Sequence, residues 1–351
     1  MLIRSFIILT FFSVLCASAQ NVPLPASSVY FDINTKVIQR QSIDQVIVTE
    51  MVNRLILAVT GKTNPGDAWR SLAGPKDVIG IKVAAGGGEI SGTHPEIVRA
   101  IAEGLIAAGL SKNRIIVWDR KKQDLIASGF SQNNENYQLH WVDDGDGYDR
   151  KMPISAPVLG KLIFGDNDFK NRASMRFSDL VAQKEQLSDE SYFANTLKKV
   201  TKIINIPTLS DSYYTGVGGA IPNMTLSNLD NWRRFVRPPR FGDPYLAEIY
   251  SDPRIGGKVV LTILDAIVVQ YAGGPFPDPH FATSAFSIYA SKDPVAIDAI
   301  AMRTIDEYRL LHQLPKIEPI STYIQSAASI GLGNYDETRI EKIRVGTDYS
   351  Q

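Results

Sequence analysis

Two different patterns of apolar residues follow one another in the first quarter of the chain. Between residues 43 and 61 the apolar residues recur at helical spacing, and residues 78–83 form a short apolar run. This order is typical of an α-helix that precedes a buried strand. Residues 20–42 are expected to be an extended lead-in. Residues 66–75, which include Trp69, are expected to form a loop.

The stretch from residue 78 to residue 120 predicts a strand, a glycine loop, a helix and a second strand. The loop is Gly86-Gly87-Gly88, and the second strand is Ile115-Ile116-Val117-Trp118. Thr93 is expected to cap the intervening helix, because a hydroxyl shortly before Pro95 suits a helix N-terminus.

Short apolar runs continue to alternate with helical segments up to the end of the chain. Further strands are expected at 137–142, 159–164, 202–206, 257–271 (one bent strand or two short ones), 286–290 and 340–345. Further helices are expected before Gly129, at 190–200, from Pro294 and from about Ser321. This alternation predicts an α/β fold with a mixed, largely parallel sheet flanked by helices on both faces. Residues 20–351 are expected to form a single domain, and a division into two lobes near 145–200 remains open.

The first 19 residues have the features of a secretory signal peptide. Arg4 precedes an apolar run, from Phe6 to Leu15, that is too short to span a membrane. Ala17-Ser18-Ala19 suits a cleavage site. A lipoprotein signal is disfavoured, because Leu15 stands where that signal needs a small residue before Cys16. The protein is therefore expected in the periplasm or outside the cell.

Several classes of site are excluded by composition. Cys16 is the single cysteine, and cleavage after Ala19 would remove it. The mature protein could then form no disulfide, no thiolate zinc site and no cysteine-ligated iron–sulfur cluster. The 37 basic residues balance the 37 acidic ones, which gives no general attraction to nucleic acid or to an anionic membrane. No second apolar stretch is long enough to span a membrane.

Known motifs for nucleotide, hydrolase and metal sites are missing from the sequence. Ser91 stands where a dinucleotide fingerprint has its third glycine, and no phosphate loop, nucleophile elbow or H-E-x-x-H occurs. The segment Asp143–Asp149 fails the calcium-loop template and is interpreted as an acidic turn with glycines. The sequence motifs therefore indicate no particular metal and no particular cofactor.

Polar residues near the ends of the first two strands are the leading candidates for a site. Lys82 lies near the carboxyl end of its strand, and Asp119 and Arg120 end the second strand. Proteins of the α/β class place ligands at this edge of the sheet. His94 stands at the start of the helix. Structural alternatives are an ion pair for Lys82 and a backbone contact for His94.

Glycines and two further aspartates extend the candidate site. Gly86, Gly87 and Gly88 could bind an anion through their N–H groups, or could simply allow a tight turn. Asp265 and Asp298 lie in apolar surroundings, where a carboxylate must be paired, bound to a metal or protonated. Their structural alternative is a buried pair or a helix cap.

The segment from Trp232 to Phe241 combines four arginines with three aromatic residues. Such a mixture suits an anionic ligand or a protein partner. The alternative is a surface loop that its aromatic residues hold against the body of the protein.

Six short blocks, spread over nearly the whole mature chain, carry a family resemblance. They are Val78–Val83, Thr93–Glu96, Ile115–Arg120, Lys202–Pro207, Gly273–Pro275 and Ala290–Ala299. Together they resemble the domain of unknown function 362 family, which implies an α/β domain. Some members of that family carry an iron–sulfur module, which suggests redox work, but this chain has neither the module nor a mature cysteine.

A second departure from the family follows Pro207. The family pattern continues with a lysine and a histidine, and later with a lysine–asparagine pair. This chain has Thr208-Leu209-Ser210-Asp211 and Pro222-Asn223, so that the asparagine is kept and its basic partners are not. Chemistry that depends on those basic groups is therefore not expected here.

The leading hypothesis is an exported α/β protein with a ligand or active site at the carboxyl edge of the sheet. The residues expected to act there are Lys82, His94, Asp119, Asp265 and Asp298, with Gly86, Gly87, Gly88, Arg120 and Asn223 lining the site. A small polar or anionic ligand is expected, with lysine holding its charge and histidine or aspartate moving protons.

Two other classes of function remain open at this point. A non-catalytic periplasmic binding or assembly protein would use Trp232–Phe241 as its interface and would expose an apolar patch there. Electron transfer with a separate redox partner is disfavoured by the missing cysteines.

Overall fold

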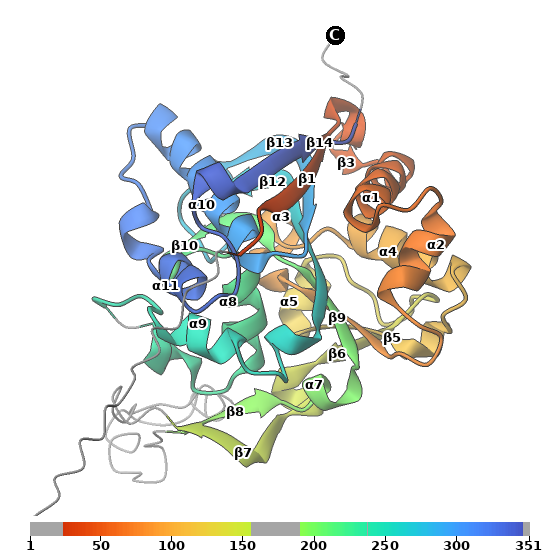
Figure 1. The fold of residues 1–351 in the computed structure, drawn as a ribbon, viewed down its shortest axis with the longest axis horizontal. Helices are drawn as coiled ribbons and strands as arrows, with labels where there is room; N and C mark the ends of the chain where they lie inside the picture. The colour runs from red at the N-terminus through yellow and green to blue at the C-terminus, as the bar shows by residue number, and fades with distance from the viewer. Residues whose placement is uncertain (1–23, 156–189, 237, 347–351) are drawn as a thin grey trace, which may run out of the picture.

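One large sheet forms the centre of the molecule. The computed structural model describes residues 24–155, 190–236 and 238–346 (Figure 1). Its strands are β1 (Ser27–Ile33), β4 (Ile79–Val83), β5 (Ile115–Asp119), β6 (Gln138–Trp141), β9 (Lys202–Ile206), β10 (Thr208–Ser212), β11 (Gly216–Val217), β12 (Val259–Gln270), β13 (Ala282–Ser291) and β14 (Ile340–Arg344). They follow the order β14-β1-β13-β12-β9-β4-β5-β6, while β10 pairs with β12 and with β11. Two small sheets pair β2 (Ile38–Gln39) with β3 (Ser42–Ile43), and β7 (Tyr148–Ser155) with β8 (Glu190–Ala194).

Helices cover both faces of the large sheet. The described α-helices are α1 (Gln45–Thr60), α2 (Pro65–Leu72), α3 (Gly88–Ser91), α4 (Pro95–Ala107), α5 (Lys122–Ala127), α7 (Thr196–Lys199), α8 (Ala220–Thr225), α9 (Tyr245–Tyr250), α10 (Pro294–Leu311) and α11 (Tyr323–Ser329). Helices α1, α2 and α4 pack together on one side, and α8, α9, α10 and α11 pack together on the other (Figure 1). The predicted α/β fold, with a mixed sheet between two helical layers, is confirmed.

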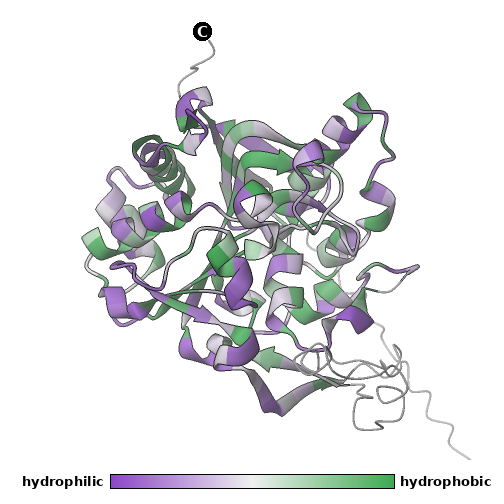
Figure 2. Ribbon diagram, turned by 180° about the vertical axis from the view of Figure 1, so that it is seen from behind, coloured by the Kyte–Doolittle hydropathy of each residue, from purple (hydrophilic) through white to green (hydrophobic). Residues whose placement is uncertain are grey.

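Each face of the sheet contributes to its own apolar core. Along β5, Ile115 and Val117 belong to the core under α1 and α4, whereas Ile116 and Trp118 belong to the core under α8 and α10. This alternation follows from the period of two in a strand. The strands at the centre of the molecule are accordingly mostly hydrophobic in Figure 2.

The parallel strands bring their carboxyl ends to one edge of the sheet. β4 is parallel to both β5 and β9, and β5 is parallel to β6. The long strand β12 pairs in parallel with β9 along its first half and with β10 along its second half. The chain therefore leaves β9 and continues through β10 past the edge where β4 and β5 end, and it adds polar residues beside them.

Two local predictions along the first two hundred residues are wrong. The expected loop at 66–75 is helix α2, which Asn64 caps by accepting from the N–H of Asp67. Trp69 is fully buried on that helix, and burial of its large ring favours an ordered segment. The helix expected at 190–200 is instead strand β8 followed by the short helix α7. The lead-in contains β1, which lies between β13 and β14.

The cap predicted for helix α4 is also wrong. His94 occupies the N-cap position without a side-chain cap hydrogen bond, and Pro95 is the first helical residue. The Thr93 hydroxyl donates to the backbone oxygen of Ile206 and accepts from the N–H of Ala84. Thr93 therefore links the ends of β4 and β9 instead of capping the helix.

Some predictions fall outside the described residues. These are the signal peptide at 1–19, the strand at 159–164 and most of the lobe boundary at 145–200. Among the helices in the described part, none combines the length and apolar character needed to cross a bilayer.

Candidate functional site

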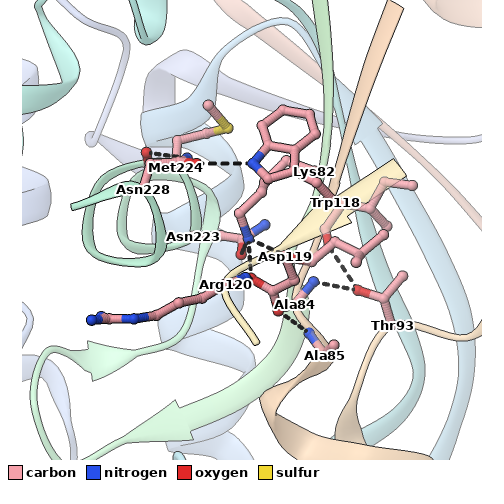
Figure 3. A network of polar contacts seen from close by, with 12 residues as sticks. Lys82, Ala84, Ala85, Thr93, Trp118, Asp119, Arg120, Asn223, Met224 and Asn228 are labelled. Atoms are coloured by element: carbon pink, nitrogen blue, oxygen red, sulfur yellow. Dashed lines mark hydrogen bonds and ion pairs between the residues drawn. The ribbon is translucent and has the colours of Figure 1, made fainter. Parts of the chain in front are cut away.

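The ammonium group of Lys82 is surrounded by oxygen atoms. Its Nζ donates to Asp119 Oδ1 at 2.7 Å, to Asn223 Oδ1 at 3.0 Å and to the backbone oxygen of Val83 at 2.6 Å (Figure 3). The side chain has no exposed surface. Because an ammonium group has three N–H donors, all of them are used within the protein.

Asp119 joins the ends of β4 and β5. Its Oδ2 accepts from the N–H of Ala85 at 2.7 Å, and its Oδ1 accepts from the N–H of Arg120 as well as from Lys82. Charge-assisted hydrogen bonds of this kind fix a carboxylate in one orientation. The side chain of Arg120 extends away from this network in Figure 3.

The protonation of Lys82 is set by two opposing effects. Burial lowers the pKa of the ammonium group by more than the charge and the hydrogen bond of Asp119 raise it, so the pKa lies below its usual value. All three N–H donors of Lys82 are occupied and its side chain has no exposed surface. Lys82 therefore orients Asp119 and Asn223. It does not reach a ligand in this conformation, so the predicted direct role in holding ligand charge is not supported by the geometry.

A cavity of about 1160 Å³ opens beside Asp119 at this edge of the sheet. Its lining comes from two stretches of chain, residues 84–150 and residues 208–276. The predicted residues that line it are Asp119, Arg120, Asn223, Gly86 and Gly87. A cavity of this size is larger than most pockets that enclose one small ligand.

Asp211 on β10 also lines the cavity and was missed by the sequence analysis. Its Oδ1 accepts from the N–H of Gly274 at 2.8 Å, and its Oδ2 lies 3.6 Å from Nη1 of Arg309. Burial raises the pKa of this carboxyl to about 6, against the opposing effects of Gly274 and Arg309. The sequence feature that could have identified Asp211 is its position shortly after Pro207, where the chain departs from the family pattern.

His94 and Asp265 form a pair of their own, and neither lines the cavity. Nδ1 and the backbone N of His94 each lie 2.8 Å from Asp265 Oδ2. Burial alone would lower the pKa of His94, but the charge and hydrogen bond of Asp265 outweigh it, so the pKa lies above its usual value. The pair holds the start of α4 against β12, which is the structural alternative to the predicted catalytic role.

Asp298 on α10 caps helix α8. Its carboxylate accepts from the N–H groups of Ala220 and Ile221 and from the hydroxyl of Tyr323. Burial raises its pKa to about 7, although these hydrogen bonds act in the opposite direction. Asp298 does not line the cavity, and its contacts are those of the helix cap that was the structural alternative to the predicted catalytic role.

The glycine loop is explained by tight packing. A Cβ on Gly87 would lie 2.5 Å from the backbone N of Gly92, and Gly88 has a φ of 56°. A Cβ on Gly86 would meet no atom within 4 Å. The turn interpretation therefore accounts for Gly87 and Gly88, and Gly88 does not line the cavity.

The segment Trp232–Phe241 is held against the protein. Arg234 is fully buried and donates to the Ser191 hydroxyl and to the backbone oxygen of Ile154, both at 2.8 Å. Phe235 and Val236 are buried as well, whereas Trp232 lines the cavity. Within the described part of this segment, the exposed apolar patch that an interface would need is not found.

The carboxylates of the acidic turn near the cavity form ion pairs and hydrogen bonds with other side chains of the protein. Asp143 pairs with Arg120 at 3.2 Å and accepts from the Tyr148 hydroxyl. Asp146 contacts His140 and Lys199. Across the described ranges, no three histidine, cysteine, aspartate or glutamate side chains are grouped to hold a metal ion.

Residues 79–303 match the sequence model of a known family, described as domain of unknown function (DUF362). This span is more than half of the 351 residues. The chain belongs to the DUF362 family. The DUF362 match begins at β4 and ends within α10, so it contains Lys82, Asp119, Asp211 and Asn223.

The fold of this DUF362 protein is also similar to a solved structure, the lactate racemase apoprotein from Thermoanaerobacterium thermosaccharolyticum. The two share 8% sequence identity, with a TM-score of 0.41. The similarity covers 82% of this chain and 58% of the racemase chain, which is less than two thirds of that protein. No curated protein matches the chain in sequence.

Proposed function

We propose that this DUF362 protein binds a small polar, anionic ligand in the cavity and exchanges a proton with it through Asp211. The observation that carries the proposal is that two carboxyl groups in different environments, Asp119 and Asp211, line one cavity. Pairs of carboxyl groups with contrasting surroundings are typical of acid–base sites.

The two carboxyl groups suit different roles. Asp119 receives three N–H donors and is fixed by the buried ammonium of Lys82. It is therefore suited to orienting a ligand hydroxyl or amide. Asp211 has a pKa of about 6, which lets it both accept and release a proton near neutral pH.

Cationic side chains on the cavity wall support an anionic ligand. Lys121 and Arg150 are exposed residues of the lining, although Arg150 Nη1 also lies 3.5 Å from Oδ2 of Asp230. Lys122 lies 4.7 Å from the ring centre of Trp141. The lining carboxylates Asp119 and Asp143 are already paired with Lys82 and Arg120. The lining holds five basic and five acidic residues, so an anion would be attracted locally, beside the exposed Lys121 and Arg150, and not by the charge of the whole cavity.

The proposal can be tested by calorimetric titration with sulfate and tartrate near pH 6, in two buffers of different ionisation enthalpy. Both anions are fully ionised at that pH, so any proton taken up on binding goes to the protein. Binding is expected to weaken about tenfold in the Lys121→Ala/Arg150→Ala variant. The matched Lys62→Ala/Lys112→Ala variant, which removes two exposed lysines elsewhere, is expected to bind normally.

Proton uptake tests whether the anion binds beside Asp211, as proton exchange through this carboxyl requires. An anion near Asp211 raises the pKa of its carboxyl further, so binding should take up part of a proton in the wild type and none in Asp211→Asn. Equal uptake in both proteins, or no saturable binding of either anion, would contradict the proposal. Binding without Asp211-dependent uptake would favour the non-catalytic binding protein.

We also propose that the protein is exported, on the strength of residues 1–19. Expression in a bacterial host followed by mass spectrometry of the periplasmic fraction should detect a chain that begins at Gln20. Recovery of the full-length chain from the cytoplasm alone would contradict this.

A further inference from the structure

Serine and threonine side chains contribute to the lining of the cavity. Six serine and threonine residues contribute: Ser91, Thr208, Ser210, Ser212, Thr215 and Ser227. Several are already arranged as small networks, since Thr208 and Ser210 contact each other at 3.2 Å and Ser91 donates to Gln270. A hydroxyl both donates and accepts, so such a surface matches a ligand that is itself rich in hydroxyl groups.

Aromatic rings surround the same cavity. Trp141, Tyr148, Tyr214, Trp232 and Phe276 all belong to its lining. The rings of Tyr214 and Trp232 meet edge to face, with their centres 5.0 Å apart. Arg120 and Arg233 lie 5.8 Å and 4.7 Å from the ring centre of Trp232, which adds positive charge beside an aromatic surface.

One of these rings is exposed. Phe276 has 69% of its surface exposed, and the neighbouring loop places Tyr213 at 66%. The two loops are tied together, because the N–H of Tyr213 donates to the backbone oxygen of Gly274 at 3.0 Å. Two exposed aromatic rings on linked loops beside a cavity are a surface on which a ligand can stack.

These features together describe the chemistry of one ligand class. The polarised C–H groups on the face of a sugar ring pack against the electron-rich face of an aromatic ring. Its hydroxyl groups match serine, threonine, asparagine and carboxylate side chains. A cavity of about 1160 Å³ has room for more than one ring. The exposed Lys121 and Arg150 favour negative charge on the part of the ligand that meets them.

We infer that the cavity binds a short acidic oligosaccharide, a chain of a few sugar rings that carry carboxylate groups. The inference rests on the proposed anion-binding function and assigns the ligand class to that site. In this arrangement Phe276 and Tyr214 stack on sugar rings, the serine and threonine hydroxyls of the lining bind ring hydroxyl groups, and Lys121 and Arg150 bind the carboxylates.

The test is calorimetric titration of the mature protein with trigalacturonate, maltotriose, galacturonate and sulfate. Maltotriose has the same number of rings without charge, galacturonate has one charged ring, and sulfate is charged without a ring. Trigalacturonate is expected to bind about tenfold or more tightly than each of the other three, since both stacking and charge contribute.

Two variants and a control separate stacking from charge. Phe276→Ala, and separately Tyr214→Ala, should weaken trigalacturonate binding about fivefold or more and leave sulfate binding unchanged. Leu311→Ala removes another exposed apolar side chain, 79% exposed and outside the cavity lining, and should change neither.

The outcomes distinguish this inference from the proposed function. If sulfate and tartrate bind but trigalacturonate has no advantage over them, the inference is overturned and the anion site stands. Tighter binding of maltotriose than of trigalacturonate overturns the requirement for charge and with it the inference. If no probe binds, both the inference and the proposed function fail.

Discussion

Nζ of Lys82 lies 2.7 Å from Oδ1 of Asp119, although 37 residues separate them in the chain. The contact follows from topology, because β4 and β5 are parallel neighbours in which Lys82 stands opposite Trp118. The side chain that follows Trp118 therefore emerges at the edge of the sheet beside the lysine.

Replacement of Lys82 by methionine should strongly destabilise the protein. The change leaves a nearly buried carboxylate without its ammonium partner, which costs about 3–5 kcal/mol in the free energy of unfolding. Urea denaturation of the variant would measure it. Lys202→Met is the matched control, because its ion pair with Asp77 is more exposed and should contribute at most about 1 kcal/mol.

The double variant Lys82→Met/Asp119→Asn should be more stable than the sum of the two single changes predicts. No uncompensated charge remains in it, and asparagine can still accept a backbone N–H. Strictly additive losses would show that the two residues do not act as a pair.

Asp211 should make the stability fall as the pH rises from about 4 to about 6. In the unfolded chain this carboxyl loses its proton near pH 3.8, whereas in the folded protein it keeps the proton up to about 6. The unfolded state therefore binds fewer protons in this window, and the free energy of unfolding decreases with pH, by at most about 3 kcal/mol.

Denaturation curves at several pH values would test this dependence. Asp211→Asn should flatten the pH profile between 4 and 6, because asparagine can still accept from Gly274 but cannot ionise. Asp67→Asn should not flatten it, since the pKa of Asp67 is lowered and its effect falls below this window. Identical profiles for wild type and Asp211→Asn would contradict the prediction.

His94 should titrate above its usual range in the folded protein. NMR titration should place its pKa above 6.5, and Asp265→Asn should bring it below 6.5, because burial then acts without the opposing carboxylate. The pair stabilises the fold below pH 6.5, and this contribution is lost as the pH rises through the folded pKa. A pKa unchanged by Asp265→Asn would rule out the assigned cause.

Two neighbouring glycines should respond differently to alanine. Gly87→Ala places a Cβ 2.5 Å from Gly92 N and should cost about 1–3 kcal/mol in stability, whereas Gly86→Ala meets no atom within 4 Å and should be nearly neutral. Thermal denaturation compares the two directly. Equal losses would show that the loop needs glycine at both positions for its backbone conformation.

The sequence predicts the fold well where local periods and cap residues agree with tertiary structure. The run at 78–83 and the strand ending at Asp119 are both found, and the family assignment is confirmed by the match over residues 79–303. The predictions are wrong where tertiary contacts determine the local structure. Thr93 could cap a helix, but it lies between two strand ends and bonds to them instead.

The candidate site was predicted only in part, for a similar reason. Lys82, Asp119 and Asn223 do meet, but the sequence cannot show that the lysine is saturated by oxygen atoms. Apolar surroundings correctly marked Asp265 and Asp298 as buried, yet burial alone does not distinguish a structural pair from a reactive group. Asp211 lies in a polar stretch, and only the path of β10 beside β12 carries it to the cavity.

The separation between the buried lysine network and the exposed aromatic residues has a consequence for engineering. Lys82 is buried and joins the ends of β4 and β5 through Asp119, whereas Phe276 and Lys121 are exposed residues of the cavity lining. Libraries that vary the second group should keep the fold and change what is bound. We expect such changes to alter specificity at little cost in stability, because substitutions of exposed side chains usually change the free energy of unfolding only slightly.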